Sequence, residues 1–493
     1  MALRLFNTLS GQVEDFRPLV DNEVRMYACG PTVYDYGHIG NFRTFIAVDI
    51  LRRYLQLSGF KVKHVMNITD VDDKIIRNST AAGLSVQQYT AKYQKAFFED
   101  AGALKIEQPQ IVRATENIAA MAEFIAKLAE KGCAYKTDDG SYYFRIAKFP
   151  AYGKLSKKDF AGMEDGARVD VDEYEKDNAR DFALWKAPKP REASWDSVIG
   201  PGRPGWHIEC SVMSMKELGE SFDLHAGGED LIFPHHENEI AQSESLTGKQ
   251  FAHFWFHARF LLVEGEKMSK STGNFFTLRD LVLKGYRPST IRYLLTSVPY
   301  RNQLNFTFDG LQSAASSVDR LRNFRQRLAG KLPEGSSLTM VTLGEHTSKR
   351  LRDAMDDDLN TAQAQAAIFD MIRAVNSAMD AGDVKSGDVA ALLAPLEEFD
   401  QIFSVLQDDD TAQMQRICEW AKAEGREKDV SPELEEIIRS ASLTDSQIDA
   451  KVEQMIAARK ARDFATSDKI RAELVAQGIL IEQTKEGVRW RRK

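Results

Sequence analysis

The stretch VRMYACGPTVYDYGHIGNFRTF, residues 24–45, decides the fold class of this chain. Its beginning, VRMYACG, alternates in the manner of a β-strand. Apolar residues then recur at helical spacing from Ile39 to Leu55, and the turn between the two segments carries Gly37 and Gly40. We predict a strand that enters a helix through a turn open to a nucleotide, because a helix N-terminus favours phosphate. An ordinary strand-to-helix loop with a capping histidine is the alternative.

The alternation of predicted strands and helices continues along the chain and is interrupted by a segment that predicts a β-hairpin. Residues 61–69 and 222–228 are predicted strands, and residues 120–132 are a predicted helix. This order indicates an α/β fold with a Rossmann-like parallel sheet. Residues 133–146 instead predict a β-hairpin that turns at Asp139-Gly140, which is foreign to a doubly wound sheet. We therefore interpret this part of the chain as an insertion into the core.

Composition limits the function classes. The 493 residues carry a net charge of −8, so no overall basic character points to nucleic acid, although a local basic surface would suffice. The N-terminus has no apolar region of the signal-peptide kind, and no run of apolar residues approaches the length of a membrane span. We expect a cytoplasmic protein that does not enter a membrane.

The segment FPHHENEI, residues 233–240, offers half of a metal site. Pro234 suits a first helical turn, and His235 and Glu239 then stand four residues apart on one face. An imidazole and a carboxylate at that spacing can reach one zinc ion, which usually takes four ligands. A solvated, self-paired helix start is the alternative. The four cysteines are far apart and contain no CxxC pair, so further ligands require long-range assembly.

Two further segments could face a phosphate or a ribose. EGEKMSKSTGN, residues 264–274, places Lys267 and Lys270 in a glycine-bearing loop after an apolar run, with a solvated charged loop as the alternative. HAGGEDL, residues 225–231, ends a predicted strand, and Asp230 could accept hydrogen bonds from ribose hydroxyls. Each segment alone is a weak signal.

Together these segments carry a family resemblance. HIGN (38–41) followed by KMSKS (267–271) resembles the signature pair of the class I aminoacyl-tRNA synthetases. The resemblance implies that the first motif holds the nucleotide and the second clamps its phosphates. It gives the expected catalytic residues His38, Lys267 and Lys270, and the ATP-binding residues Gly37, His38, Gly40, Asn41, Asp230 and Lys270. Asn41 stands where the family usually has a histidine; an amide can donate a hydrogen bond but carries no charge.

Within that class the chain resembles the cysteinyl-tRNA synthetases over essentially its whole length. The residues that carry the resemblance are CGPTVYDYGHIG, GWHIECS (205–211) and FPHHENE. They imply one zinc ion per chain, held by Cys29, Cys210, His235 and Glu239, and a substrate pocket that includes Thr32, Trp206 and His225. A soft thiolate binds zinc far better than a neutral hydroxyl, so the metal would select cysteine over serine. Plain core packing is the alternative for Trp206 and His225, and we interpret His207 and His236 as structural.

The resemblance also supplies a domain division. After residue 311 the apolar spacing favours an α-helical bundle, and the polar, acid-rich residues 408–446 are interpreted as a loose connector, with a short helix as the alternative. The expected segments are 1–120 for the first half of the catalytic core, 121–204 for a connective insertion, 205–250 for the second half of the core, 251–310 for a stem-contact region with the KMSKS loop, 311–407 for the bundle and 447–493 for a small C-terminal anticodon-binding module.

The implied function is that of a cysteine–tRNA ligase. Its expected partners are cysteine tRNA, ATP and L-cysteine, with Mg²⁺ bound to ATP and the chain acting as a monomer. Residues 457–474 predict the start of a helix–turn–helix. Arg459, Phe464 and Asp468 in this segment match family positions that contact anticodon bases; a buried, core-forming Phe464 is the alternative. Two rival functions use other parts of the pattern: an ATP-dependent ligase that joins cysteine to an amino sugar on the same core, and a non-catalytic, zinc-stabilised RNA-binding paralogue.

Overall fold

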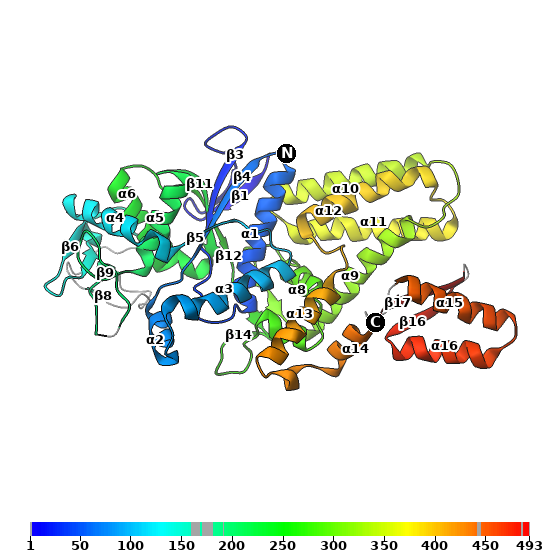
Figure 1. The fold of residues 1–493 in the computed structure, drawn as a ribbon. Helices are drawn as coiled ribbons and strands as arrows, with labels where there is room; N and C mark the ends of the chain where they lie inside the picture. Colours follow the sequence, from blue (N-terminus) through cyan, green and yellow to red (C-terminus); the bar gives the residue numbers. More distant parts are fainter. Residues whose placement is uncertain are drawn as a thin grey trace.

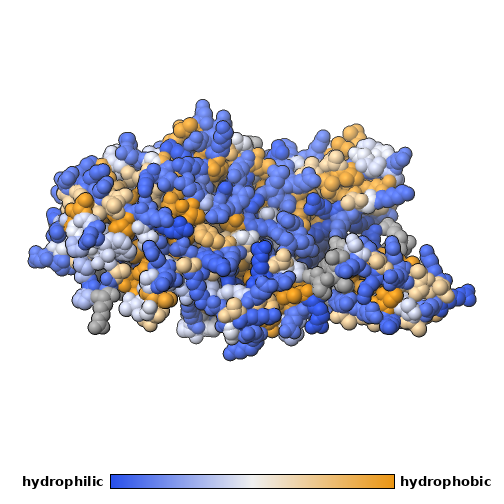
Figure 2. All heavy atoms as spheres, in the orientation of Figure 1, coloured by the Kyte–Doolittle hydropathy of each residue, from blue (hydrophilic) through white to orange (hydrophobic). Residues whose placement is uncertain are grey.

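The computed structural model describes residues 2–158, 168–169, 181–190, 192–440, 445–484 and 487–492. Figure 1 shows an elongated molecule with a central sheet, an insertion at one end, and a helical bundle and a small C-terminal module at the other. In the space-filling view hydrophilic side chains cover most of the visible face, with hydrophobic ones scattered among them (Figure 2). Among the described helices, none is long and apolar enough to cross a membrane.

A parallel five-stranded sheet forms the centre of the molecule and confirms the predicted α/β class. Its strand order is β12-β11-β3-β4-β5. The strands are β3 (Glu23–Ala28), β4 (Lys61–Ile68), β5 (Gln110–Arg113), β11 (Phe222–Gly228) and β12 (Ala252–Ala258). From β3 the first half of the chain runs to β4 and β5, whereas the second half runs through β11 to β12 on the other side. In an open sheet the crevice at such a reversal, beyond the carboxyl ends of the strands, is where ligands bind.

The two faces of the sheet pack against different parts of the chain. Successive strand residues point to opposite faces. Met26 and Ala28 therefore join the apolar core that includes helix α1 (Ile39–Leu57) and the helical bundle, whereas Tyr27 and Cys29 join the core around helix α5 (Trp206–Leu218). This alternation alone brings Cys29 to the side of the sheet where α5 and α6 (Glu237–Thr247) lie.

The expected insertion contains a second sheet, which includes the β-hairpin that the sequence predicted. Helix α4 (Ile118–Glu130) leads into an antiparallel hairpin that turns at Gly140, whose φ of +98° favours glycine. The strands are β6 (Ala134–Lys136), β7 (Tyr142–Phe144), β8 (Arg168–Val169), β9 (Asp181–Lys186) and β10 (Arg203–Pro204). Residues 159–167, 170–180 and 191 of the expected insertion lie outside the described residues.

Shorter elements complete the core. A hairpin of β1 (Arg4–Asn7) and β2 (Gln12–Asp15) lies beside β12, and a small sheet of β13 (Leu262–Val263), β14 (Glu266–Lys267) and β15 (Asn305–Phe306) carries the KMSKS loop. The chain turns between β13 and β14 at Glu264-Gly265, both with positive φ. The remaining core helices are α2 (Asp73–Ala82), α3 (Val86–Ala103), α7 (Leu278–Leu283) and α8 (Pro288–Leu295).

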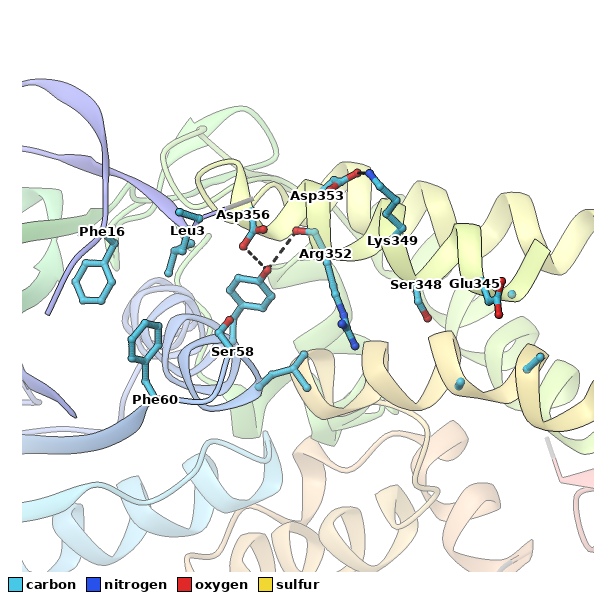
Figure 3. A pocket seen from close by; sticks show the side chains of 16 residues that line it. Leu3, Phe16, Ser58, Phe60, Glu345, Ser348, Lys349, Arg352, Asp353 and Asp356 are labelled. Carbon is cyan, nitrogen blue, oxygen red and sulfur yellow. Dashed lines mark hydrogen bonds and ion pairs between the residues drawn. The ribbon is translucent and has the colours of Figure 1, made fainter. Parts of the chain in front are cut away.

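The bundle docks on α1 beside a hollow. Its helices are α9 (Phe308–Leu328), α10 (Leu338–Asp356), α11 (Thr361–Ala381) and α12 (Val389–Phe403). A cavity of about 980 Å³ lies between α10 and α12 on one side and the end of α1 and the N-terminal segment with Leu3 on the other (Figure 3). The Tyr54 hydroxyl donates to Asp356 at 2.6 Å in this cavity. This cavity is a junction between core and bundle and lacks the predicted site residues.

The interpretation of residues 408–446 as a loose connector is wrong, and the structure has helices there, which was the alternative. Residues 410–440 form α13 (Asp410–Ala423) and α14 (Pro432–Ser440), and α13 packs against α7 and α8. The sequence contains the reason, because Met414, Ile417, Cys418 and Ala421 recur at helical spacing and are all buried. The other residues of the segment are mostly polar, so its average composition conceals the apolar stripe.

The C-terminal module has its own small core. It consists of α15 (Asp445–Lys460), α16 (Phe464–Ala476), β16 (Ile479–Thr484) and β17 (Gly487–Arg492). Five buried residues hold it together: Ile448, Val452, Met455, Leu474 and Ile479. The two helices are those that the sequence predicts around residues 457–474; the antiparallel pair β16 and β17 was not predicted.

Candidate active site

A buried cluster of sulfur, nitrogen and oxygen atoms lies on one face of the parallel sheet. Cys29, Cys210, His235 and Glu239 each offer one ligand atom, and these atoms all lie within 4.8 Å of one another. Cys29 follows β3, Cys210 lies in α5 and Glu239 in α6. Residues 181 positions apart in the chain, Cys29 and Cys210, thus meet in the fold. All four residues that the family resemblance implied as ligands are brought together.

The local backbone around His235 differs from the prediction. Helix α6 begins at Glu237, and residues 232–236 form a wide, irregular turn in which Phe233 is extended (φ −140°, ψ 132°). The residue before a proline avoids the helical region, so Phe233 cannot continue a helix into Pro234. The side chains still meet as expected, since His235 Nε2 lies 3.1 Å from Glu239 Oε1.

The spacing of these atoms fits a small tetrahedral ion. Two sulfurs at about 2.3 Å from such an ion lie about 3.8 Å apart. The Sγ atoms of Cys29 and Cys210 are 3.8 Å apart, and Glu239 Oε1 is also 3.8 Å from Cys29 Sγ. A donor set of two thiolates, one imidazole and one carboxylate is typical of zinc and unlike the all-oxygen sets of Mg²⁺ or Ca²⁺.

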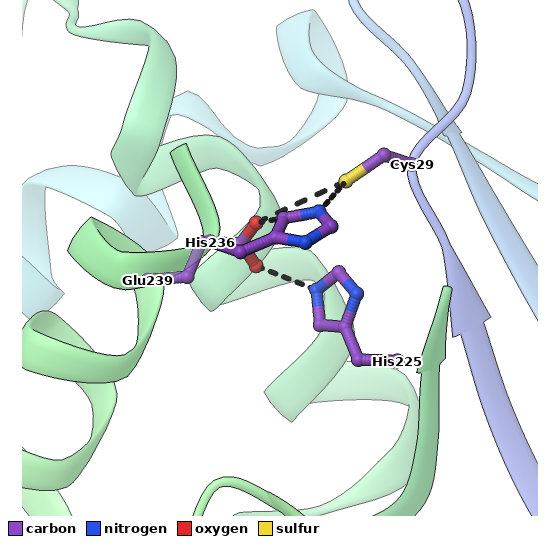
Figure 4. Close-up of side chains that lie close together, drawn as sticks. All are labelled: Cys29, His225, His236 and Glu239. Atoms are coloured by element: carbon purple, nitrogen blue, oxygen red, sulfur yellow. Dashed lines mark hydrogen bonds and ion pairs between the residues drawn. The ribbon is translucent and has the colours of Figure 1, made fainter. Parts of the chain in front are cut away.

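A second, overlapping set competes for the ion. Figure 4 shows the side chains of Cys29, His225, His236 and Glu239 close together. Their ligand atoms also lie within 4.8 Å of one another. In this set His225 Nε2 contacts Glu239 Oε2 at 2.8 Å, which is a hydrogen-bond distance. Glu239 can therefore accept a hydrogen bond at Oε2 while Oε1 faces the ion. The first set is favoured because its soft second thiolate, from Cys210, replaces that hydrogen-bonded imidazole.

Further histidines form a layer around the ligands. His207 Nδ1 lies 3.0 Å from His235 Nδ1, and His236 Nε2 lies 3.2 Å from the Cys29 sulfur. A chain continues from His236 Nδ1 to His257 Nε2 at 2.8 Å. Outer hydrogen bonds of this kind orient metal ligands. His207 and His236, which the sequence analysis interpreted as structural, thus contact His235 and Cys29 of the cluster directly. His257 had no sequence signal because it lies in a plain strand.

Burial and mutual contact set the charge states in this cluster. Burial raises the pKa of Cys29 well above its ordinary value. Burial acts in the same direction on Cys210, but the hydrogen bonds with Cys29 and His235 and the charge of His235 together outweigh it and lower the pKa of Cys210 to about 6. Burial alone would lower the pKa of His235, but the neighbouring Glu239 raises it to about 10. The negative charges of Cys210 and Glu239 thus hold protons on Cys29 and His235, and a bound cation would displace those protons.

Two of the three expected pocket residues, Trp206 and His225, contact the cluster. The half-buried Trp206 ring stacks on His235 with 4.2 Å between ring centroids. Thr32 forms an isolated β-bridge with Thr69 just after β3. His225 is fully buried, stacked on Trp255 and bonded to Glu239, so it supports a ligand from behind. Only Trp206 and Thr32 retain exposed surface beside the cluster.

The turn that is predicted to hold a nucleotide, residues 30–38, begins immediately after Cys29, and we refer to it as the nucleotide turn. His38 is the N-cap of α1, and its Nδ1 accepts the backbone N–H of Asn41 at 3.1 Å. Burial, with a smaller effect of Lys270, lowers the pKa of His38 to about 4. The imidazole is therefore neutral at pH 7, and with Nδ1 accepting, Nε2 carries the proton. Asn41 Oδ1 accepts the His38 backbone N–H, which leaves the amide nitrogen as the outward donor.

The KMSKS loop lies against this turn. A Cβ atom on Gly40 would lie 3.3 Å from the Met268 methyl group and 3.0 Å from the His38 ring, so glycine permits this close approach. Lys270 Nζ donates to Asp35 Oδ2 at 2.6 Å and lies 5.0 Å from the Phe275 ring centre. Lys267 and Asp230 are exposed on the surrounding surface. The structure thus brings Lys270 to the nucleotide turn, while the reach of Lys267 and Asp230 stays a prediction.

The predicted anticodon residues lie far along the chain in the C-terminal module. Phe464 and Asp468 are one turn apart on α16, and Arg459 lies near the end of the preceding α15. Phe464 is 58% exposed, so the alternative of a core-forming phenylalanine is wrong. The other two side chains are also exposed.

Comparisons with known proteins agree with this arrangement. The family described as tRNA synthetases class I (C) catalytic domain matches residues 15–316, and the DALR domain family matches residues 350–407, within the bundle. The chain is 66% identical to a "Cysteine–tRNA ligase" of Koribacter versatilis, with 100% of both chains covered. It is 56% identical to a protein of the same name from Solibacter usitatus and 43% identical to one from Thermococcus onnurineus, each covered by at least 99%.

Solved structures show the same fold at lower identity. A Mycobacterium tuberculosis methionyl-tRNA synthetase in complex with methionyl-adenylate superposes with a TM-score of 0.56 at 16% identity, covering 82% of this chain and 92% of that one. A complex of Agrobacterium radiobacter LeuRS with tRNA and LeuAMS gives a TM-score of 0.59 at 12% identity, covering 81% and 86%. The full-length identities, the catalytic-domain match and the cluster together lead to one conclusion. The chain belongs to the cysteine–tRNA ligase family of the class I aminoacyl-tRNA synthetases.

Proposed function

We propose that this chain activates cysteine with ATP to give cysteinyl-adenylate and pyrophosphate, and then transfers the cysteinyl group to the 3′-terminal ribose of cysteine tRNA. The observation that carries the proposal is the adjacency of two sites. Cys29 belongs to the buried cluster, and the turn that begins at Gly30 leads within nine residues to the N-cap of α1 at His38. A thiol held at the cluster therefore places its amino acid beside the nucleotide turn.

The first step needs no protein nucleophile, because the substrate carboxylate attacks the α-phosphorus directly. Positioning and charge stabilisation should supply most of the catalysis. We assign the Lys270 ammonium and the His38 Nε2–H to the phosphates in the transition state, with Lys267 reaching from the same loop. Gly37 and Gly40 leave room for the nucleotide, the Asn41 amide donates to it, and Asp230 accepts from its ribose. Mg²⁺ bound to ATP would neutralise phosphate charge.

The cluster would hold one zinc ion through Cys29, Cys210, His235 and Glu239. The 3.8 Å separation of the two sulfurs supports this set. Zinc bound there would supply a thiophilic Lewis acid that prefers a substrate thiolate to a hydroxyl. Trp206, Thr32 and His225 then shape and support the surroundings of the side chain. A site that demands one polar partner can reject an analogue by about 10⁴–10⁵-fold, which makes hydrolytic editing unnecessary.

The C-terminal part would recognise tRNA. Arg459, Phe464 and Asp468 present an arginine, a ring and a carboxylate on the surface of the module, a set suited to unpaired bases. The expected division into core halves 1–120 and 205–250, insertion 121–204, stem-contact region 251–310, bundle 311–407 and module 447–493 is part of the same proposal. So are a monomeric state, since one chain provides every site residue, and a cytoplasmic location, where tRNA is charged for translation.

The two rival functions have less support. An amino-sugar ligase has no use for an anticodon module, yet the identity to the Koribacter protein extends over 100% of both chains. A non-catalytic paralogue has no reason to keep Lys270 at the nucleotide turn, where it lies 2.6 Å from Asp35.

Cysteine-dependent ATP–pyrophosphate exchange and charging of cysteine tRNA test the proposal together. We expect both activities with cysteine and essentially none with serine. Exchange without charging, combined with ligation of cysteine to an amino sugar, would support the rival ligase. Absence of both activities in a zinc-loaded, folded protein would support the non-catalytic paralogue.

A further inference from the structure

Asp35 occupies a place between the two signature motifs that neither motif explains. It lies three residues before His38 in the nucleotide turn, and its Oδ2 accepts from Lys270 Nζ at 2.6 Å. Its other oxygen, Oδ1, accepts the backbone N–H of Tyr36 at 2.8 Å. One carboxylate thus shapes the turn with one oxygen and holds the lysine of the KMSKS loop with the other.

The ion pair with Asp35 determines which position of the Lys270 side chain is populated. The Lys270 side chain is 64% exposed and belongs to a loop whose residues 269–274 bond mainly to one another. The aromatic ring of Phe275 adds a second contact, because the ammonium lies 5.0 Å from its centre and the same ring meets the His38 ring at 5.2 Å. Asp35 and Phe275 therefore draw the lysine over the nucleotide turn before any phosphate is present. The Asp35 carboxylate also raises the pKa of Lys270, so the ammonium stays charged there.

The place of Asp35 is set in turn from helix α13. The Tyr36 ring lies 5.3 Å from the Trp420 ring, and its hydroxyl accepts from Trp420 Nε1 at 3.2 Å. The Arg279 guanidinium stands 4.6 Å from the Trp420 ring centre and 5.3 Å from that of Tyr36. Arg279 itself is 1% exposed and is fixed by Asp100 at 2.8 Å. The dipeptide Asp35-Tyr36 is thus clamped between the core and the helix that follows the bundle.

We infer that Asp35 is a positioning residue that holds the Lys270 ammonium over the nucleotide turn, and that α13 sets its place through the contact of Tyr36 with Trp420. The inference rests on the proposed function, since it concerns the lysine assigned to the phosphates. Asp35 does not touch the reacting atoms. It acts through Lys270. In the transition state the Lys270 ammonium exchanges its contact with Asp35 for a contact with the phosphates.

Asp35→Asn isolates this role. Asparagine keeps an oxygen that accepts the Tyr36 N–H, but it places an NH2 donor where Oδ2 accepts from Lys270, so both the charge and the hydrogen bond to Lys270 are lost. An exposed ion pair of this kind is worth up to about fivefold in the population of one geometry. We expect kcat for cysteine activation to fall by about that factor. The KM for ATP should stay unchanged or fall, because a carboxylate beside the triphosphate has also been removed.

Salt and a protease give readouts that a merely structural role would not produce. Raising the salt concentration to about 0.5 M screens the ion pair, so the ratio of wild-type to Asp35→Asn activation rates should approach one. Without ATP, trypsin should cleave after Lys270 several-fold faster in Asp35→Asn, while cleavage after Lys267 in the same loop serves as the internal control. An unchanged kcat, or a lowered kcat with a raised KM for ATP and unchanged cleavage, would overturn the inference.

The part played by α13 has its own variants. Tyr36→Phe and Trp420→Phe each remove one end of the hydrogen bond and keep an aromatic ring. Each variant should lower kcat about twofold, which is less than the effect of Asp35→Asn. The kcat of the double variant should be no lower than that of either single variant. Glu419→Gln, exposed on the same helix, is the matched control and should behave like wild type. Additive losses, or none, would show that Trp420 does not act through Tyr36.

Failure of this inference and failure of the proposed function are distinguishable. If the wild-type protein shows no cysteine-dependent exchange, the proposed function is wrong, and the trypsin comparison still decides whether Asp35 holds Lys270. If the wild type is active and Asp35→Asn matches it in kcat and in cleavage, only the inference is wrong.

Discussion

The buried cluster and the KMSKS loop are proposed to serve the same reaction, but one is buried and rigid and the other is exposed. Cys29, Cys210, His235 and Glu239 of the cluster are at most 7% exposed and contact further histidines. Lys270 is 64% exposed and is held by an ion pair at the surface. Both regions lie at the carboxyl end of the parallel sheet. The cluster lies beyond the ends of the neighbouring strands β3 and β11, and the KMSKS loop lies against the turn after β3.

The difference follows from what each region must distinguish. Cysteine and serine differ by one atom, and only a rigid, buried donor set can make that difference costly. Phosphates change charge and position as pyrophosphate leaves, so a group that stabilises them must be able to move with them and be released. Variants in the cluster should therefore abolish cysteine activation, whereas variants near the loop should lower the rate of cysteine activation.

Cys210→Ser should have the largest effect. Replacing one of two thiolates weakens the grip on a soft ion, and we expect substoichiometric zinc and a loss of cysteine activation on the order of 10³-fold or more. Elemental analysis and pyrophosphate exchange are the measurements. Cys418→Ser, at a cysteine that is also buried but lies in α13, is the control and should keep its zinc. Undiminished zinc in Cys210→Ser would remove Cys210 from the site and favour the set that contains His225 and His236.

Lys270→Ala should come next. A lysine that acts on transition-state phosphates contributes to rate more than to binding, so adenylate formation should slow on the order of 10²–10³-fold. Zinc content and cysteine binding should stay nearly intact, which separates the loop from the cluster. Pre-steady-state formation of the adenylate measures the effect, with Lys284→Ala at the end of α7 as an exposed lysine control. A wild-type rate in Lys270→Ala would make the KMSKS segment an ordinary solvated loop.

Phe464→Ala extends the comparison to the C-terminal module, where the effect should be smaller and confined to the second step. Stacking of one base on an aromatic ring is worth about 1–3 kcal/mol, so charging of tRNA should fall roughly tenfold, mainly through KM. Pyrophosphate exchange should not change, because the ring belongs to a module with its own core. Val475→Ala, another exposed apolar residue of α16, is the matched control. Equal charging by Phe464→Ala and wild type would refute the anticodon role of this ring.

The smallest effect is expected from pH acting on His38. Burial lowers its pKa to about 4, below the ordinary value of a histidine, so the imidazole stays neutral down to acidic pH. The ratio of activation rates between wild type and His38→Asn should therefore be constant from pH 6 to 8. Because the unfolded chain would protonate this histidine near pH 6.5, its contribution to stability is present above that pH and is lost as the pH falls towards 4. An inflection of the rate ratio near pH 6.5 would show that His38 acts as a cation.

The sequence by itself determined the features that depend on near neighbours. The strand-turn-helix around residues 24–57 follows from local periodicity, and the contact of His235 with Glu239 survives the irregular turn because the two residues are close in the chain. The family resemblance added Cys29 and Cys210, which no spacing could have paired across 181 residues.

Only the tertiary structure decided the rest, because long-range packing leaves no periodic trace in a sequence. Alternation along β3 turned Cys29 towards α5, and parallel pairing of β11 with β12 placed His257 behind His236. The same packing converted the acid-rich residues after 408 into α13, whose narrow apolar stripe is stable as a helix only against α7 and α8. That docking brings Trp420 to Tyr36, 384 residues away in the chain, and so reaches the nucleotide turn.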